Sequence, residues 1–135
     1  MKRKMLLTLL LACSTARASE WISLGESANG TQVTTVDVSS ISIVGSVRLA
    51  WRKVVFAAHS RKSPTDANKW QSYQVVRDAI NCAEGTSRFE AVSYYYEDGT
   101  HEYMSPEFLP GPWQPVPPDT MASIEMQFIC TWKPK

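Results

Sequence analysis

"PPDTMASIEMQFIC", residues 117–130, decides the fold, because helical periodicity appears here after a chain rich in strand patterns, and the helix ends in a cysteine. Asp119 or Thr120, directly after Pro118, predicts the N-cap of a helix. Six apolar residues at helical spacing form one wide face: Met121, Ala122, Ile124, Met126, Phe128 and Ile129. We therefore expect a C-terminal helix that lies on a sheet, with Cys130 near its end.

The preceding sequence is typical of short strands joined by turns. Alternating apolar and polar residues, together with β-branched and aromatic residues, predict strands at 21–24, 32–38, 46–58, 70–83, 87–97 and 101–104. Asn-Gly at 29–30 and Asp-Gly at 98–99 favour tight hairpins. The predicted fold class is α+β: an antiparallel meander of about five or six strands with the C-terminal helix packed on one face.

Some segments depart from simple alternation. After the alternating residues 47–52, the apolar run 54–56 predicts a bulge or a strand covered on both faces. Asp37, Ser39 and Ser40 are expected to bend the chain after the second strand, because their side chains bond nearby backbone amides.

Two further segments lack the strand pattern. Residues 59–69 carry a proline, several charges and no large apolar residue, which predicts an exposed loop. Six of the eight prolines lie in residues 106–118, where we expect an extended crossing loop and no central strand.

The N-terminus has the features of an export signal. Basic residues 2–4 precede an apolar run at 5–12, and Ala-Arg-Ala at 16–18 forms a cleavage motif. We expect a signal peptide of residues 1–18 and a single mature domain of residues 19–135. The alternative is a lipoprotein signal of residues 1–12, in which Leu-Leu-Ala before Cys13 acts as a lipobox and Cys13 carries a lipid.

Export changes the charge of the chain. The precursor has a net charge of +1, but residues 1–18 hold four of its 14 basic residues and no acid, so 10 basic residues face 13 acidic ones, a net charge of −3. A mildly acidic domain has no electrostatic reason to bind nucleic acid or anionic lipid. We expect no nucleic-acid partner, and membrane contact only through a lipid on Cys13.

The chain has three cysteines: Cys13, Cys82 and Cys130. Signal cleavage discards Cys13 and lipidation occupies it, so either route leaves Cys82 and Cys130 in an oxidising compartment, where a disulfide is expected. Two separately buried thiols are the alternative. A bridge closing 47 intervening residues would contribute about 4 kcal/mol by chain entropy and would tie the helix to the sheet.

No motif in the sequence favours catalysis. The two histidines, His59 and His101, lie in no zinc-binding pattern, and the six glycines are scattered rather than gathered in a phosphate-binding loop. We expect no enzyme activity, no metal site and no cofactor.

The candidate partner-binding residues lie in a loop, a strand and the proline-rich segment. Basic residues at 61, 62 and 69 would attract an acidic partner, with a solvated loop as the alternative. In a strand, Tyr95 faces opposite to Tyr94 and Tyr96, so one side belongs to the core and the other is free to bind or to pack. Trp113 either covers the core or anchors a ligand. The six candidates are Arg61, Lys62, Lys69, Tyr94, Tyr95 and Trp113.

Three short motifs in order resemble the surface-adhesin protein E family of Gram-negative bacteria: "TVDVSSI" at 35–41, "NCA" at 81–83 and "VPPDTMASIEMQFIC" at 116–130. The resemblance covers residues 21–131. It implies a curved antiparallel sheet with a C-terminal helix held by a Cys82–Cys130 disulfide, and structural roles for Asp37, Ser40 and Ile41. It also implies an exported protein that, in some members, is a surface lipoprotein binding host extracellular-matrix proteins.

These observations predict an exported, non-enzymatic binding module of surface-adhesin type, located in the periplasm or at the outer membrane and cell surface. Its expected partner is a host extracellular-matrix protein. The alternative is a small periplasmic domain that has a structural role or holds a small hydrophobic ligand.

Overall fold

The structure is a computed structural model that describes residues 18–134. Residues 1–17, with Cys13 and nearly all of the predicted signal peptide, lie outside the described residues. The elements are β1 (Trp21–Glu26), β2 (Gln32–Val44), β3 (Val47–Phe56), β4 (Gln71–Asn81), β5 (Thr86–Tyr96), β6 (His101–Tyr103), the 3₁₀ turn η1 (Pro106–Phe108), β7 (Gln114–Pro115) and α1 (Met121–Thr131).

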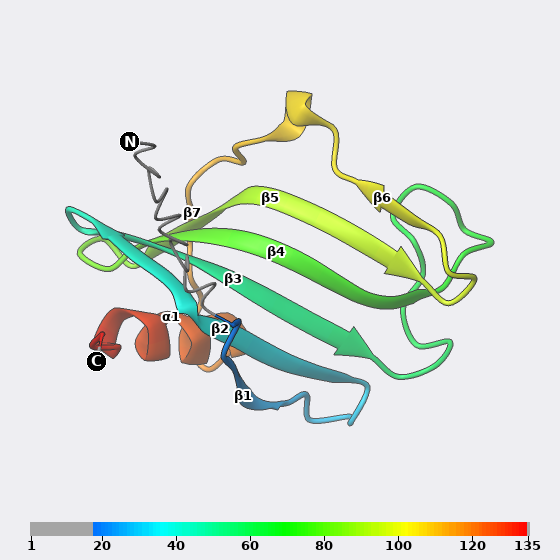
Figure 1. Cartoon of the computed structure of the whole chain (residues 1–135), viewed down its shortest axis with the longest axis horizontal. Coiled ribbons are helices and arrows are strands. Elements are labelled where there is room, and N and C mark those ends of the chain that lie inside the picture. The colour runs from blue at the N-terminus through cyan, green and yellow to red at the C-terminus, as the bar shows by residue number, and fades with distance from the viewer. Residues whose placement is uncertain (1–17, 135) are drawn as a thin grey trace, which may run out of the picture.

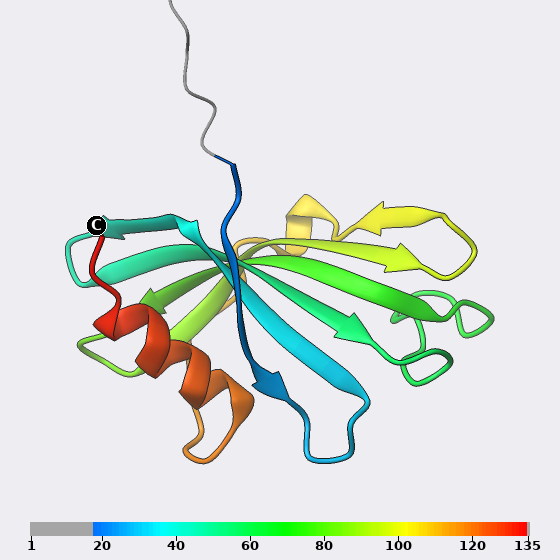
Figure 2. The ribbon, with the colours of Figure 1, turned by 60° about the horizontal axis from the view of Figure 1, so that its bottom comes forward.

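The strands form one antiparallel sheet in the order β1-β2-β3-β4-β5-β6, with β7 also paired to β5. This confirms the predicted meander, because every strand up to β6 pairs with the next one in the chain. Figures 1 and 2 show the long, twisted strands β2 to β5 with α1 lying across one face near one end of the sheet. The loop of residues 57–70 lies at the opposite end, and the proline-rich segment follows the outer edge of β5.

Strand β2 is longer than predicted, because the serine-rich bend is a bulge inside the strand and does not end it. The Asp37 carboxylate accepts hydrogen bonds from the backbone of Glu20 at 2.9 Å and of Ser39 at 3.0 Å. Ser40 Oγ donates to the Asp37 carbonyl at 2.6 Å and accepts from the Trp51 backbone at 2.9 Å. Burial raises the pKa of Asp37, but the hydrogen bonds from Ser39 and Glu20 outweigh it and the pKa is lowered.

The two faces of the sheet differ in what covers them. We call the side that contacts α1 the helix face. It carries one buried cluster of Val36, Ala50 and Ile80 around Ile129 of α1, and a second of Val76, Val92, Tyr94 and Tyr96. We call the other side the open face. In β3 the alternation places Ala50, Arg52 and Val54 on the helix face. The side of β3 that carries arginine is therefore the side that faces the helix.

The helix begins as predicted but buries a narrower face. Thr120 is the N-cap, and its side chain and that of Ser123 form a reciprocal capping box. Ile129 is fully buried, whereas Ile124 is 48% exposed. The prediction that Ile124 belongs to the packed face is therefore wrong, and the position one turn before Ile129 is taken by Glu125.

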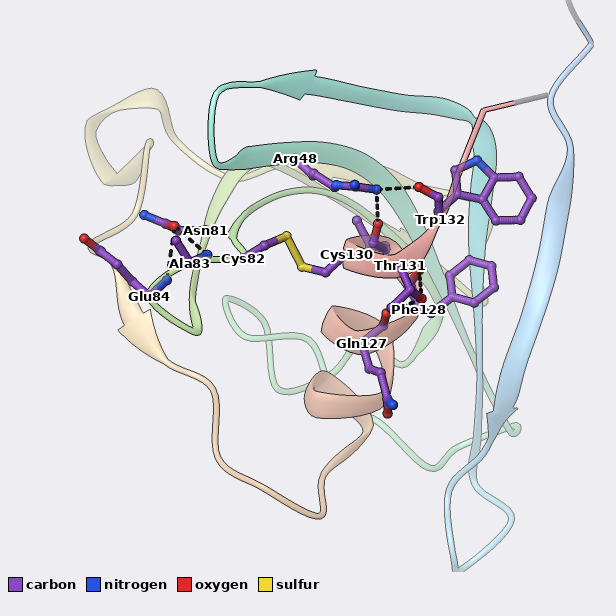
Figure 3. Close-up of a disulfide and its surroundings, with 11 residues drawn as sticks. Arg48, Asn81, Cys82, Ala83, Glu84, Gln127, Phe128, Cys130, Thr131 and Trp132 are labelled. Atoms are coloured by element: carbon purple, nitrogen blue, oxygen red, sulfur yellow. Dashed lines mark hydrogen bonds between the residues drawn. A yellow bond between two sulfur atoms is a disulfide. The ribbon is translucent and has the colours of Figure 1, made fainter.

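The predicted disulfide joins Cys82 to Cys130, with their Cα atoms 5.8 Å apart, and so ties the end of β4 to the last turn of α1 (Figure 3). Beside it, Arg48 Nη1 donates to the carbonyls of Ile129 at 2.7 Å and Trp132 at 2.6 Å. A cation at this position adds a second partner to the Ile129 carbonyl, which the Trp132 backbone N–H reaches only at 3.3 Å, and it complements the helix dipole. The C-terminal end of α1 is thus fixed by one covalent bond and two charge-assisted hydrogen bonds.

Candidate functional site

A buried ionic cluster lies between α1 and the sheet. Arg52 Nε of β3 is 2.8 Å from Asp78 Oδ2 of β4 and 3.1 Å from Glu125 Oε2 of α1. The two carboxyl side chains are almost inaccessible to solvent. Sequence reasoning missed this cluster. The one available signal was an acidic residue inside the apolar periodicity of the helix.

The cluster is close to electrically neutral at pH 7. Burial, together with the charge of Asp78 and a hydrogen bond to it, raises the pKa of Glu125 to about 8, although Arg52 acts in the opposite direction. A pKa raised above neutrality favours the protonated form of Glu125 at pH 7. Arg52 remains charged, because Asp78 and Glu125 raise its pKa more than burial lowers it. One guanidinium then balances one carboxylate, and the arrangement holds α1 in place.

Two cavities on the helix face extend from this cluster toward the loop of residues 57–70. The first, of about 400 Å³, lies beside α1 and is lined by Arg52, Asp78 and Glu125 among others. The second, of about 510 Å³, lies beneath the loop. Both are lined by Arg61, Gln74 and Phe89, so they form one groove, which we call the helix-face groove.

The open face carries a continuous row of apolar and aromatic side chains. The strand register aligns five residues from β2 to β6, each paired with the next: Val33, Val55, Tyr73, Tyr95 and His101. The rings of Tyr73 and Tyr95 stack with centroids 4.3 Å apart, and those of Tyr95 and His101 at 5.7 Å. We call these five residues the aromatic row.

The row explains the unbroken apolar run in β3. The pairing of β3 is regular from Lys53 to Phe56, so the predicted bulge is absent. Val55 is 40% exposed, so the alternative of two covered faces is also wrong. Within residues 18–134, Val55 is a partly exposed apolar residue on the face of the sheet that α1 does not cover.

Two cations lie on the same face. Lys53 Nζ is 4.5 Å from the centroid of the Tyr73 ring, and the Arg77 guanidinium is 5.9 Å from that of Trp51. In the described part of the chain, neither forms an ion pair with a carboxylate. The open face therefore combines partly exposed aromatic rings with unpaired positive charge.

The structure separates the three basic candidates. Arg61 and Lys62 line the same cavity of the helix-face groove, and Lys62 Nζ lies 3.6 Å from the centroid of the Trp70 ring. Lys69 points elsewhere: its Nζ donates to Thr100 Oγ1 at 2.8 Å and lies 3.6 Å from Asp98 Oδ2.

The aromatic candidates also lie apart. Tyr95 belongs to the aromatic row, whereas Tyr94 is 9% exposed and belongs to a buried cluster of the helix face. Trp113 lies beside β5, where the Arg88 guanidinium is 4.6 Å from its ring centroid, and it belongs to neither buried cluster.

The described residues hold neither a group of three or more potential metal ligands nor a helix of sufficient length and apolar character to cross a bilayer.

Known proteins can be compared with the curved meander, the C-terminal helix and the disulfide between β4 and α1. The sequence profile of the family described as Surface-adhesin protein E matches residues 21–131.

The chain belongs to the surface-adhesin protein E family.

Crystallised members have the same fold. The selenomethionine form of Haemophilus influenzae protein E is 16% identical, with a TM-score of 0.56 over 86% of this chain and 89% of that one. Crystal form II of H. influenzae protein E is 17% identical, with a TM-score of 0.55 over 91% of this chain and 96% of that one. Protein E from non-typeable H. influenzae is 19% identical, with a TM-score of 0.55 over 89% and 81%. At these identities the likeness shows the fold alone. A comparison with curated proteins finds no match.

Membership of the surface-adhesin protein E family indicates an adhesin-type binding role rather than an enzyme, and an exported protein at the cell surface.

Proposed function

We propose that this protein is an exported, non-enzymatic binding module that attaches to a host extracellular-matrix protein through its open face. The aromatic row is the observation that carries the proposal. Tyrosine, tryptophan and arginine are enriched at protein interfaces and at the residues that dominate binding energy. Here Tyr73, Tyr95 and Trp51 share one face with Arg77.

The exposure of apolar residues on the open face supports a binding role. A sheet that needs only one face for its core normally places polar residues on the other. Val33 and Val55 instead extend the row toward β2 and remain exposed to solvent. Contiguous exposed apolar surface of this kind marks interaction sites.

The two unpaired cations of the open face give it a preference for acidic partners. Lys53 and Arg77 would attract an acidic segment of the partner and orient it over the aromatic rings. Because both are accessible, their contribution to binding should weaken as salt concentration rises.

The experiment measures binding of the native protein to immobilised laminin and vitronectin. Tyr95→Ala and Lys53→Glu should each weaken binding at least tenfold while the melting temperature changes little. Phe89→Ala is the matched control, because Phe89 is an exposed aromatic residue on the opposite face of β5. Equal losses in Tyr95→Ala and Phe89→Ala, or no saturable binding by the folded protein, would refute the proposal.

We also propose that residues 1–18 are removed on export and that the mature domain is residues 19–135. The alternative, lipidation of Cys13, would anchor the domain directly to a membrane. The intact mass of protein purified from the cell envelope distinguishes the two: a chain starting at Ser19 supports cleavage after Ala18, and an acylated chain starting at Cys13 contradicts it.

A further inference from the structure

The helix-face groove contains a cation that the fold does not use. Arg61 lines both cavities and lies where they meet, with its guanidinium 6.0 Å from the centroid of the Phe56 ring. Within residues 18–134 it forms no ion pair. An arginine held over an apolar wall without a carboxylate is poised to receive one from a ligand.

The other charges in the groove do not compensate for Arg61. Asp78 and Glu125 line the first cavity, but both already pair with Arg52, whose Nε lies 2.8 Å from Asp78 Oδ2 and 3.1 Å from Glu125 Oε2. In the second cavity the remaining charged residue is Lys62, which is also a cation. The unpaired charge of the groove is therefore positive and lies near its middle.

Apolar and polar side chains share the walls on either side of Arg61, and the apolar ones lie in both cavities. Phe89, 45% exposed, lies between the two cavities. The first cavity adds Val54, Phe56, Ile80, Val116, Met121 and Met126, and the second adds Val76, Val92, Tyr94 and Met104. Three of these side chains are methionines, which adapt to ligands of varied shape.

We propose that the helix-face groove binds an amphipathic carboxylate of the fatty-acid type. The carboxylate would pair with the Arg61 guanidinium, and the hydrocarbon chain would lie along the apolar wall of one cavity. Volumes of about 400 and 510 Å³ lie within the usual range for small-molecule sites. This site is separate from the open face, so it is independent of adhesion.

The test is titration calorimetry of the native protein with sodium laurate below its micelle concentration, with dodecanol and dodecyltrimethylammonium as ligands of matched chain length. Laurate should bind saturably and at least tenfold more tightly than either. Arg61→Gln should weaken laurate binding at least tenfold with an unchanged melting temperature. Arg77→Gln is the matched control, because Arg77 is an unpaired arginine on the open face, and it should bind laurate like wild type.

Chemical shifts locate the ligand independently of affinity. Laurate should shift the methyl signals of Met104, Met121 or Met126, which line the groove, and leave those of Val33 and Val55 on the open face unchanged. Laurate binding that is absent, that survives Arg61→Gln, or that is lost equally in Arg77→Gln would overturn the proposal. Failure of the laurate experiment leaves matrix binding by the Tyr95 variant unaffected, so the two proposals fail separately.

Discussion

Replacing Glu125 by glutamine tests whether the buried ionic cluster makes folding depend on pH. The pKa of Glu125 is about 8 in the folded protein against an ordinary value of 4.5. Between these values the folded state holds a proton that the unfolded state has released. The contribution of Glu125 to the free energy of unfolding should therefore be greatest below pH 4.5 and fall as pH rises toward 8, by about 1.4 kcal/mol per pH unit.

Glutamine reproduces the protonated form of Glu125 at every pH. Its amide oxygen can accept from Arg52 and its amide nitrogen can donate to Asp78, and the amide has no proton to lose in this pH range. From pH 5.5 to 7.5, the stability of Glu125→Gln relative to wild type should rise by about 2 to 3 kcal/mol. This difference is more informative than either pH profile alone, because the titration of other groups cancels.

The assay is urea unfolding of both proteins at pH 5.5, 6.5 and 7.5, with linear extrapolation to water. Glu84→Gln is the control, because Glu84 lies in an exposed turn after β4, and its difference from wild type should stay constant over this range. A constant difference for Glu125→Gln as well would show that Glu125 is ionised in the folded state and would refute the reasoning.

Three other substitutions test what holds the fold. Cys82→Ser should lower stability by about 4 kcal/mol, because the disulfide closes a long loop, and thiols that alkylate in the untreated native protein would show that the bridge is absent. Asp37→Asn should lower the free energy of unfolding by about 1 to 3 kcal/mol at pH 7, measured with urea, by weakening the bulge. Since the pKa of Asp37 is lowered in the fold, this loss should shrink as pH falls through that pKa. A loss that does not change with pH would contradict the role of the Asp37 carboxylate. Thr120→Ala should cost about 1 kcal/mol through loss of the helix cap, whereas no change in thermal unfolding would show that the cap contributes nothing.

Local patterns predicted most of the fold. The order of strands, the meander and the helix near residue 120 follow from periodicity and turn residues, which depend on neighbours in the sequence. The bend at Asp37 was expected to end a strand, and instead β2 continues through it. The local hydrogen bonds were anticipated, but whether they end a strand or form a bulge depends on the partner strands β1 and β3.

The functional surfaces were less predictable. Tyr95 was expected to face opposite to Tyr94, and the pleat of β5 places them so. Nothing local indicated which of them the helix would leave open. Lys69 is close to Arg61 in the sequence, yet the fold turns Lys69 toward Thr100 and Asp98.

The sequence by itself determined the class of fold and the helical span, because each depends on the spacing of residues, and the count of cysteines favoured a bridge between Cys82 and Cys130. Only the tertiary structure decided that Glu125 would meet Arg52 and Asp78, and that five strands would align the aromatic row. These arrangements depend on strand register and on where the helix docks, and a register shift of one residue would turn every side chain of a strand to the other face.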